Sequence, residues 1–387
     1  MQAIADMPPA EFLPMACGQA KHALDNDGLR SLAEALKERS WMARKTLAEK
    51  DSVPKRAKAV TSYDVAKEAG VSQSAVSRYL TPGASISART RAKILKAINT
   101  LGYHPNAIAR SVRTSRSSLV AVIVANFGFN PEFTEALSGA LDRRGLNTLL
   151  YTLDHESDVD HVIDQLWQFR VAGVVSAVTL STLQVQMLLD RSIPLVFLNR
   201  AYEDIPVNSV SCDQSEGERW LVNGLYEAGH KRFALVSGPA DSQVSTQRVS
   251  SAAERLTALG IKSIQTVIAD FTYQGGREAM RELARAGPLP DAVICANDML
   301  AMGCMDEARL GLGLNVPKQI SIVGFDGSAA GQWASYDLAT IRQPTNLMVE
   351  AAIDILLVRG HDPSFATEKR VFSGEFVRGG SARLAKG

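Results

Sequence analysis

Four polar residues in one short segment carry side chains that form hydrogen bonds with DNA in other proteins: Gln73, Ser74, Ser77 and Arg78. Amide, hydroxyl and guanidinium groups match the donors and acceptors on base edges in the major groove and the oxygens of phosphates. The spacing of the four residues is helical, so they lie along one short helix. We expect Gln73, Ser74 and Arg78 to read bases.

The elements that position these residues are two short helices joined by a tight turn. Thr61 and Ser72 have side chains suited to cap the first and second helix. Gly70 ends the first helix, where the backbone must adopt the left-handed conformation. A third helix is predicted over residues 87–101, with Ile94, Leu95, Ile98 and Leu101 facing a core and Arg89, Arg91, Lys93 and Lys96 facing solvent. The pattern predicts a helix-turn-helix, and spacing alone leaves an ordinary three-helix bundle open.

Charge favours the DNA-binding interpretation. Residues 55–116 contain 12 Lys and Arg against two acidic residues, a net charge of +10, whereas the whole chain carries +1 and the remainder therefore −9. Neutralisation of phosphates supplies much of the affinity of proteins for DNA. A basic segment that coincides with a helix-turn-helix indicates nucleic-acid binding more strongly than either feature alone.

Two stretches, TSYDVAKEAGVSQSAVSRYL and SARTRAKILKAINTLGYHPNAIARSV, resemble the headpiece of the LacI/GalR (lactose-repressor) family of bacterial transcription regulators. The resemblance continues to about Gly360. It implies a homodimer, with assembly into tetramers left open, whose two headpieces bind a palindromic operator in double-stranded DNA. It also implies a core that binds a small effector. In this setting Thr61, Ser72 and Asn106 would contact phosphates or fix the register on the DNA.

Residues 105–112 resemble the hinge helix of the family, which folds against its dimer mate in the minor groove. Seven or eight residues are too few to form a stable helix alone, and the small side chain of Ala109 permits close approach of a partner. The family usually has leucine as a wedge where this chain has Val112. We expect a shallower wedge and a smaller DNA bend; a plain linker is the alternative.

From Leu119 onward, apolar strand-like runs alternate with stretches of helix length. The runs cover residues 119–125, 147–153, 172–178, 194–198, 232–238, 291–296 and 320–325. Continuous apolar strands separated by helices predict doubly wound parallel sheets, and their number predicts two lobes with a ligand cleft between them. The resemblance implies the same, a type I periplasmic-binding-protein-like core whose chain crosses between lobes near Asp213, Arg342 and the C-terminal tail.

Polar residues follow several of these strands, where a doubly wound sheet binds ligands. They are Asn199, Arg200, Asn297 and Asp326. The resemblance adds Phe133, which would stack on the effector, and Arg248, whose guanidinium would hold effector hydroxyls or a carboxylate. Such a set suits a polyhydroxylated ligand, a sugar or sugar derivative. Core packing of Phe133 and helix capping, above all by Asp298, are the alternatives.

Two residues depart from the family pattern near this cleft. Glu132 stands where the family has an aromatic residue, and Gly327 stands where a second aspartate is common. The first adds a negative charge, which would disfavour a phosphorylated effector unless Arg200 and Arg248 both offset it. The second removes an acceptor.

Several functions are disfavoured by what the sequence lacks. It has no Gly-x-Gly-x-x-Gly, no P-loop and no Gly-x-Ser-x-Gly, and its six histidines lie off the predicted strand ends, so we expect neither an enzyme nor a bound cofactor or metal. The four cysteines have no paired spacing, which fits a reducing cytoplasm. No apolar run is long enough to span a bilayer, and no secretion signal is recognisable.

These observations divide the chain into an N-terminal extension (1–55), a helix-turn-helix domain (56–104), a hinge (105–116) and an effector-binding and dimerisation core (117–387). The extension is either an added interaction helix, or translation starts at Met42 and only a short basic arm precedes the helix-turn-helix. The expected function is an effector-controlled transcriptional regulator, most often a repressor in this family, acting in the bacterial cytoplasm on the nucleoid.

Overall fold

The computed structural model describes residues 60–80, 84–103, 117–125, 131–153, 156–200, 202, 205–361 and 366–385. The predicted hinge residues Asn106, Ala109 and Val112 and the N-terminal extension lie outside these ranges. The chain divides into two compact units, Met1–Pro105 and Asn106–Gly387, and each is described by itself.

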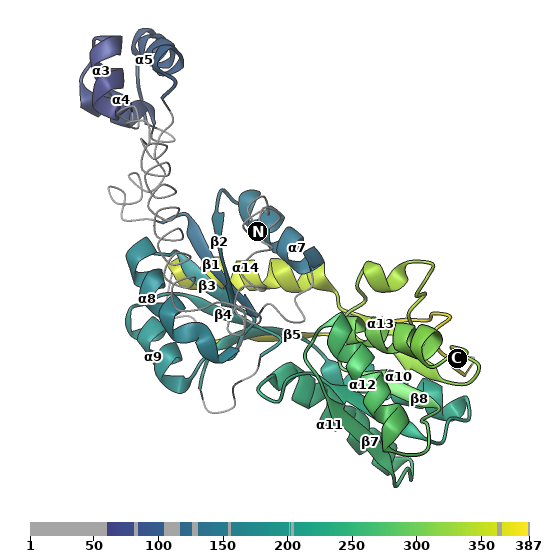
Figure 1. The fold of residues 1–387 in the computed structure, drawn as a ribbon. Coiled ribbons are helices and arrows are strands. Elements are labelled where there is room, and N and C mark those ends of the chain that lie inside the picture. The colour runs from purple at the N-terminus through teal and green to yellow at the C-terminus, as the bar shows by residue number, and fades with distance from the viewer. Residues whose placement is uncertain are drawn as a thin grey trace, which may run out of the picture. The chain divides into compact units, whose positions relative to one another are not determined.

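The described part of the first unit is a three-helix domain (Figure 1). Its helices are α3 (Ser62–Ala69), α4 (Gln73–Tyr79) and α5 (Ala88–Leu101). Gly70 ends α3 in the left-handed conformation at φ 62°, which a residue without a Cβ adopts at no steric cost. The core holds Val65 and Val76, both fully buried.

One core prediction for α5 is wrong. Ile94 is buried as expected, but Leu95 is 47% exposed, and Ala97 takes the second buried place on the helix. The small side chain of Ala97 lets α5 lie close to α3, and Leu95 is one residue beyond the inward face. Arg89, Arg91, Lys93 and Lys96 are exposed as predicted.

The second unit contains two parallel sheets with helices on both faces, which confirms the predicted α/β class. The first lobe has the strand order β2-β1-β3-β4-β5-β11. Its elements are β1 (Leu119–Ala125), α7 (Pro131–Asp142), β2 (Asn147–Leu153), a 3₁₀ turn (Glu156–Val159), α8 (Asp160–Phe169), β3 (Gly173–Ser176), α9 (Thr182–Asp190), β4 (Leu195–Leu198), β5 (Asn208–Cys212), α14 (Thr345–His361) and β11 (Lys369–Phe372).

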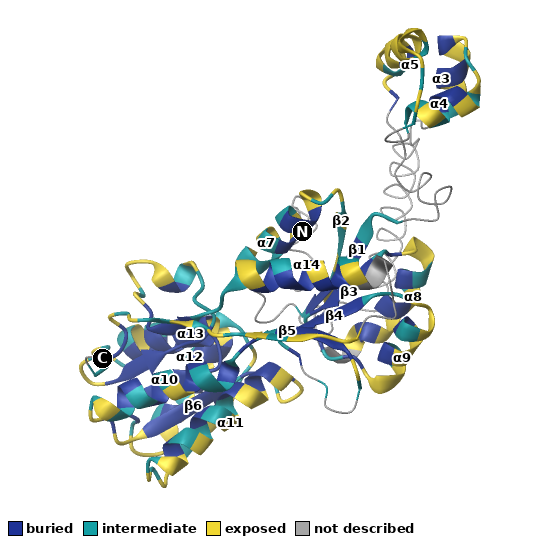
Figure 2. Ribbon diagram, turned by 180° about the vertical axis from the view of Figure 1, so that it is seen from behind, coloured by how far each residue is buried: buried dark blue, intermediate teal, exposed yellow. Residues whose placement is uncertain are grey.

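Alternate residues of β1 enter different cores, since successive side chains of a strand point to opposite faces. Ala121 and Ile123 pack with α8 and α9, whereas Val120 and Val122 pack with α7 and α14. All are nearly inaccessible to solvent, which explains why this strand appears in the sequence as an unbroken apolar run. Figure 2 shows β3 and β4 dark blue between helices whose outer faces are partly yellow.

The second lobe repeats the arrangement with the strand order β7-β6-β8-β9. Helices α10 and α11 pack on one face and α12 and α13 on the other. Its elements are α10 (Gln214–Glu227), β6 (Phe233–Ser237), α11 (Gln243–Ala258), β7 (Ile264–Ile268), α12 (Tyr273–Ala286), β8 (Ala292–Cys295), α13 (Asp298–Asp306), a π turn (Glu307–Gly311), β9 (Ser321–Val323), a 3₁₀ turn (Ala330–Gln332), β10 (Thr340–Arg342) and β12 (Glu375–Val377).

The chain passes between the lobes three times, as expected. It leaves the first sheet after β5 at Asp213, returns after β10, which ends at Arg342, into α14, and leaves again between β11 and β12. The three passages run together: the Asp213 amide donates to the Phe372 carbonyl over 2.8 Å, and Asp326 forms an isolated bridge with Arg342. Strand β10 pairs antiparallel with β12 just beyond this point.

The cysteines, the helix lengths and the grouping of possible metal ligands can be checked in the structure. Cys295 and Cys304 have no paired spacing in the sequence, yet the fold brings their sulfurs to 3.8 Å in the core, where both are free thiols. In the part of the chain that the structure describes, no helix has the length and apolarity to cross a membrane, and no three His, Cys, Asp or Glu side chains are grouped to hold a metal ion.

Candidate DNA-binding surface and effector cleft

Helix α4 carries all four residues expected to face the major groove. Ser74 and Arg78 are exposed, and Gln73 and Ser77 are half-buried. The Gln73 amide lies 3.4 Å from the Ser62 hydroxyl, which holds it against α3. Exposed polar residues on the second helix of a helix-turn-helix are placed to contact base edges.

Thr61 and Ser72 act as helix caps in this structure. The Ser72 hydroxyl accepts the Ala75 amide over 3.2 Å and also contacts the Ser74 hydroxyl at 2.9 Å. Thr61 and Asp64 form a capping box, in which the amide and hydroxyl of Thr61 donate to Asp64 over 2.8 and 2.7 Å. A phosphate contact through the Thr61 hydroxyl would therefore replace its bond to Asp64.

In the core, five side chains form a closed ring of hydrogen bonds that we call the inter-lobe network: Asn199, Gln214, Arg248, Asp326 and Gln343. Arg248 donates through Nε to Gln214 Oε1 over 2.7 Å and through Nη2 to Asp326 Oδ1 over 3.0 Å. Gln214 donates to Asn199 Oδ1 over 3.2 Å, and Asn199 donates to Gln343 Oε1 over 2.7 Å. Gln343 closes the ring by donating to Asp326 Oδ1 over 2.8 Å.

Four of the five members of the network lie after a strand or a crossover, and Arg248 lies in the second turn of α11. Asn199 follows β4 in the first lobe and Asp326 follows β9 in the second, while Gln214 and Gln343 come directly after the crossovers at Asp213 and Arg342. Carboxyl ends of parallel strands are where doubly wound sheets bind ligands. The network therefore lies where the sequence predicts the cleft, and it joins both lobes.

Arg248 is the centre of this cluster. It is 3% exposed, its Nη1 donates to the Ala296 carbonyl at the end of β8 over 2.6 Å, and its guanidinium lies 3.9 Å from the centroid of the Phe325 ring. All three nitrogens are thus engaged inside the protein. A ligand that uses this guanidinium must exchange with an internal partner.

The backbone at two of the predicted residues is strained. Asn199 has φ 51° and Asp326 has φ 131°, values that side chains with a Cβ rarely adopt. Such conformations persist where the surrounding structure imposes them, and they are often found at binding sites. Here the ring of hydrogen bonds and the bridge to Arg342 hold both residues.

Burial dominates the electrostatics of the carboxylates around the network. It raises the pKa of Asp326, although Arg248 acts in the opposite direction, and together with the charge of Asp326 it raises the pKa of Asp298 to about 6. Glu218, one turn after Gln214 on α10, is fully buried, and burial raises its pKa to about 8. Burial therefore raises the pKa of all three carboxyl groups, Asp326, Asp298 and Glu218.

The assignment of helix caps differs from the expectation. Asn297, predicted as an effector contact, is the residue that caps α13, since its Oδ1 accepts the Leu300 amide over 2.9 Å. Asp298, expected as the cap, instead accepts the Thr340 hydroxyl over 2.6 Å and the Ser328 amide over 2.6 Å. The cap lies one residue earlier because Asn297 keeps an extended backbone, at φ −153°, whereas α13 begins at Asp298.

The structure also explains glycine at position 327. A Cβ there would lie 2.5 Å from the Cα of Arg342, and the residue has φ 70°. The loop after β9 crosses the second lobe-to-lobe passage too closely for a side chain. An aspartate acceptor is excluded here on steric grounds.

Phe133 and Arg200 do not join the network. Phe133 is half-buried and packs on the core of the first lobe, and its stacking on an effector stays a prediction. Arg200 is 7% exposed and donates to the carbonyl of Asn199 over 3.1 Å. Of the six predicted effector residues, Asn199, Arg248 and Asp326 belong to the network: Arg248 bonds directly to Asp326, and Asn199 is joined to both through Gln214 and Gln343.

Two members of the network, Gln214 and Gln343, were not predicted. Each is one glutamine next to a crossover, and nothing in its local sequence marks it as part of a site.

A pocket of about 480 Å³ adjoins the network; its lining includes Glu132, Asp326, Ala329, Arg342, Gln343 and Leu347. This pocket draws residues from both lobes.

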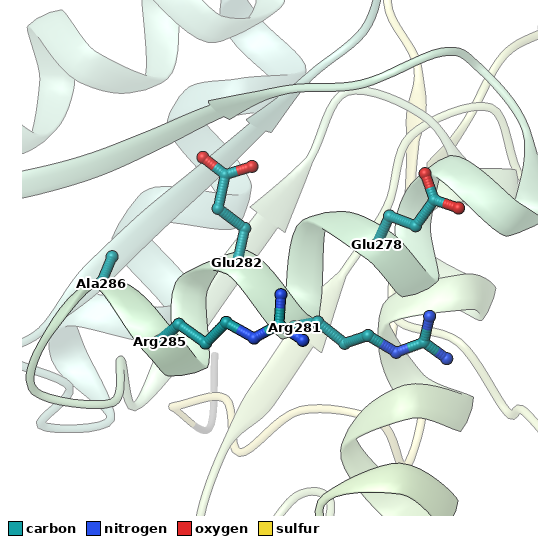
Figure 3. A pocket seen from close by; sticks show the side chains of 5 residues that line it. All are labelled: Glu278, Arg281, Glu282, Arg285 and Ala286. Carbon is teal, nitrogen blue, oxygen red and sulfur yellow. The ribbon is translucent and has the colours of Figure 1, made fainter.

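A second hollow, of about 470 Å³, is formed along α12 alone. Figure 3 shows that Glu278, Arg281, Glu282, Arg285 and Ala286, which line it, follow one another along that helix. Arg281 is already paired with Glu307 at 2.7 Å. This hollow draws its lining from one helix, whereas the 480 Å³ pocket beside the network draws residues from both lobes, so that pocket remains the candidate effector site.

Comparison with known proteins agrees with this division of the chain. Residues 61–106 match the family "Bacterial regulatory proteins, lacI family", and residues 222–382 match "Periplasmic binding protein-like domain". The HTH-type transcriptional regulator CelR of Thermobifida fusca is 32% identical over 311 residues, which cover 76% of this chain and 90% of that protein.

Solved structures give the same picture. The lac repressor dimer bound to operator and the anti-inducer ONPF superposes with a TM-score of 0.75 at 27% identity, over 85% of this chain and all of that one. A CelR–cellobiose complex superposes with a TM-score of 0.62 at 27% identity, over 83% of this chain and 99% of that one. With a helix-turn-helix headpiece, a two-lobed core and these relatives, the chain is a member of the LacI family of DNA-binding transcriptional regulators, which are not enzymes.

Proposed function

We propose that this protein is a transcriptional repressor that binds a palindromic operator as a homodimer and responds to a carbohydrate bound between its lobes. The observation that carries the effector part is the inter-lobe network. It collects donors and acceptors from both lobes at strand ends, which is what recognition of several hydroxyl groups requires. The likeness to a regulator solved with cellobiose supports a carbohydrate. Acting on operators, the protein works in the cytoplasm.

The network also supplies a route from effector to DNA. Its two glutamines adjoin the crossovers at Asp213 and Arg342, so a ligand that exchanges with Arg248 or Asp326 changes the bonds that hold the crossovers. A ligand shifts the equilibrium between two lobe arrangements by the difference between its binding free energies for the two. The lobe rearrangement would then alter the dimer and its hold on the operator.

The DNA-binding part is tested by selecting sequences from a random pool with the full-length protein. We expect enrichment of palindromes. Arg78→Ala should then reduce binding to the selected site by about tenfold or more while non-specific binding changes little. Lys96→Ala, on the exposed face of α5, should weaken both kinds of binding alike. Selection of sequences without symmetry would contradict binding by a twofold dimer.

The effector part is tested by adding mono- and disaccharides to the complex with the selected operator. One of them should change the operator affinity, and the change should disappear in Arg248→Lys, which keeps a positive charge but loses the fork of donors. A carbohydrate response that survives in Arg248→Lys would remove the network from the site.

A further inference from the structure

A hydrogen bond between the lobes closes one side of the 480 Å³ pocket. Glu132 lies in the first turn of α7 in the first lobe, and its Oε1 accepts the backbone amide of Ala329 over 2.8 Å. Ala329 belongs to the loop after β9 in the second lobe. Both residues line the pocket, together with Asp326 and Gln343 of the network.

We propose that Glu132 is a specificity-determining residue of the effector pocket, which fastens the lobes through Ala329 and rejects effectors that carry a negative charge. The inference rests on the proposed carbohydrate effector and narrows its class. Neutral and amino sugars would be accepted, whereas sugar acids and sugar phosphates would be excluded.

The charges that line the pocket support this exclusion. Among the residues that the structure describes, they are the carboxylates of Glu132 and Asp326 and the guanidinium of Arg342, which is bonded to Glu375 over 2.8 Å. The two carboxylates sense one another, since Glu132 contributes to the raised pKa of Asp326. Like charges brought together in a poorly solvated site are a common means of rejecting the wrong ligand.

Arg248 neutralises Asp326 by pairing with it, and it offers no donor to an incoming anion while that pair is intact. Its Nη2 faces Asp326, and its other two nitrogens are bonded to Gln214 and to the Ala296 carbonyl. A phosphate or carboxylate would have to displace Asp326 and leave that carboxylate buried near Glu132. A hydroxyl or ammonium group instead donates to the carboxylates as they stand.

Glu132 has a second effect: its hydrogen bond with the Ala329 amide holds the two lobes together at the pocket. Glutamine at position 132 keeps an oxygen that accepts the Ala329 amide and removes the charge, whereas alanine removes both. Glu135, exposed one turn later on α7 and outside the pocket lining, supplies the control for the loss of one charge from this helix.

The experiment measures thermal stabilisation and then dissociation constants for sugars that differ in charge: glucose, glucosamine, glucuronate and glucose 6-phosphate; ribose and ribose 5-phosphate; and cellobiose. The full-length wild type should bind a neutral or amino member at least tenfold more tightly than its acid or phosphate. Glu132→Gln should reduce that preference about tenfold, and Glu135→Gln should leave it unchanged. Glu132→Ala should in addition weaken the neutral sugar, by about tenfold, relative to Glu132→Gln.

Each other result is decisive. Tighter binding of an acid or phosphate by the wild type, or an unchanged preference in Glu132→Gln, overturns the inference while the carbohydrate effector stands. Equal affinities of the Gln and Ala variants for the neutral sugar remove the role of the Ala329 bond. No stabilisation by any sugar overturns the proposed effector, and the inference with it.

Discussion

Replacing Glu218 by glutamine should make the protein's stability far less dependent on pH. Glu218 is 1% exposed on α10, and neither carboxyl oxygen has a hydrogen-bond partner among the described residues. Burial raises its pKa from 4.5 to about 8, with Arg248 acting weakly in the opposite direction. The folded protein therefore keeps this carboxyl protonated through the neutral range.

The magnitude follows from proton linkage. Below pH 4.5 the carboxyl is protonated in both the folded and the unfolded chain, so pH has no effect through this group. Between pH 4.5 and 8 only the folded chain holds the proton, and the free energy of unfolding falls by about 1.4 kcal/mol per pH unit. The total loss is on the order of 5 kcal/mol and is complete above pH 8.

The assay is urea unfolding of the full-length protein between pH 5 and 8.5, followed by tryptophan fluorescence, to which Trp220, two residues from Glu218, contributes together with three other tryptophans. The stability of Glu218→Gln relative to wild type should rise steadily with pH, whatever constant offset the buried amide causes. Glu227→Gln, an exposed change on the same helix, controls for the loss of one charge. A difference between wild type and Glu218→Gln that stays constant over this range would refute the assignment of a buried neutral acid.

Three further predictions concern the site and the headpiece. Arg248→Met should lower the free energy of unfolding by about 3–5 kcal/mol, because Asp326 stays buried without its counter-charge, and adding Asp326→Asn should recover most of the loss in urea unfolding. Gly327→Ala should cost about 2 kcal/mol or more, since its Cβ meets Arg342, whereas Gly313→Ala, at a similar φ of 66° in open space, should cost about 1 kcal/mol. Ser72→Ala should destabilise the headpiece by about 1 kcal/mol through loss of the α4 cap, measured by amide hydrogen exchange; unchanged exchange would argue against the cap.

Much of the core fold could be predicted because its central strands are buried on both faces. The observed β1, a central strand, coincides with the predicted run at residues 119–125; β2, an edge strand that is only partly buried, also coincides with its predicted run at 147–153. Strand β5 (Asn208–Cys212) was not predicted, because its sequence NSVSC alternates polar and apolar residues and shows no apolar run. Its polar residues find partners only in the fold: the Asn208 amide donates to the Leu195 carbonyl, and its side-chain oxygen accepts the Glu368 amide.

The site was predictable only in part, for a similar reason. Asn199 and Asp326 directly follow apolar strands, so position along the chain marks them. Gln214 and Gln343 acquire their roles because the crossovers bring together segments 129 residues apart, and local sequence holds no trace of that. Glu218 is the least predictable residue of all. A glutamate in a helix is expected on the solvent-exposed face, but tertiary packing buries this one.

The three lobe-to-lobe passages have a mechanical consequence. Two bodies joined by one strand can separate, twist or slide, but each added covalent link of fixed length removes freedom, since a trans peptide spaces Cα atoms at 3.8 Å and does not stretch. Here the links run together, tied by the Asp213–Phe372 bond and the contact of Asp326 with Arg342. Translation of the lobes is thereby blocked, and rotation about the bundle of links is the motion that is left. Opening of the cleft should therefore be largest at its mouth, near Glu132 and Ala329. It should be smallest at the inter-lobe network, which lies beside the rotation axis formed by the three links.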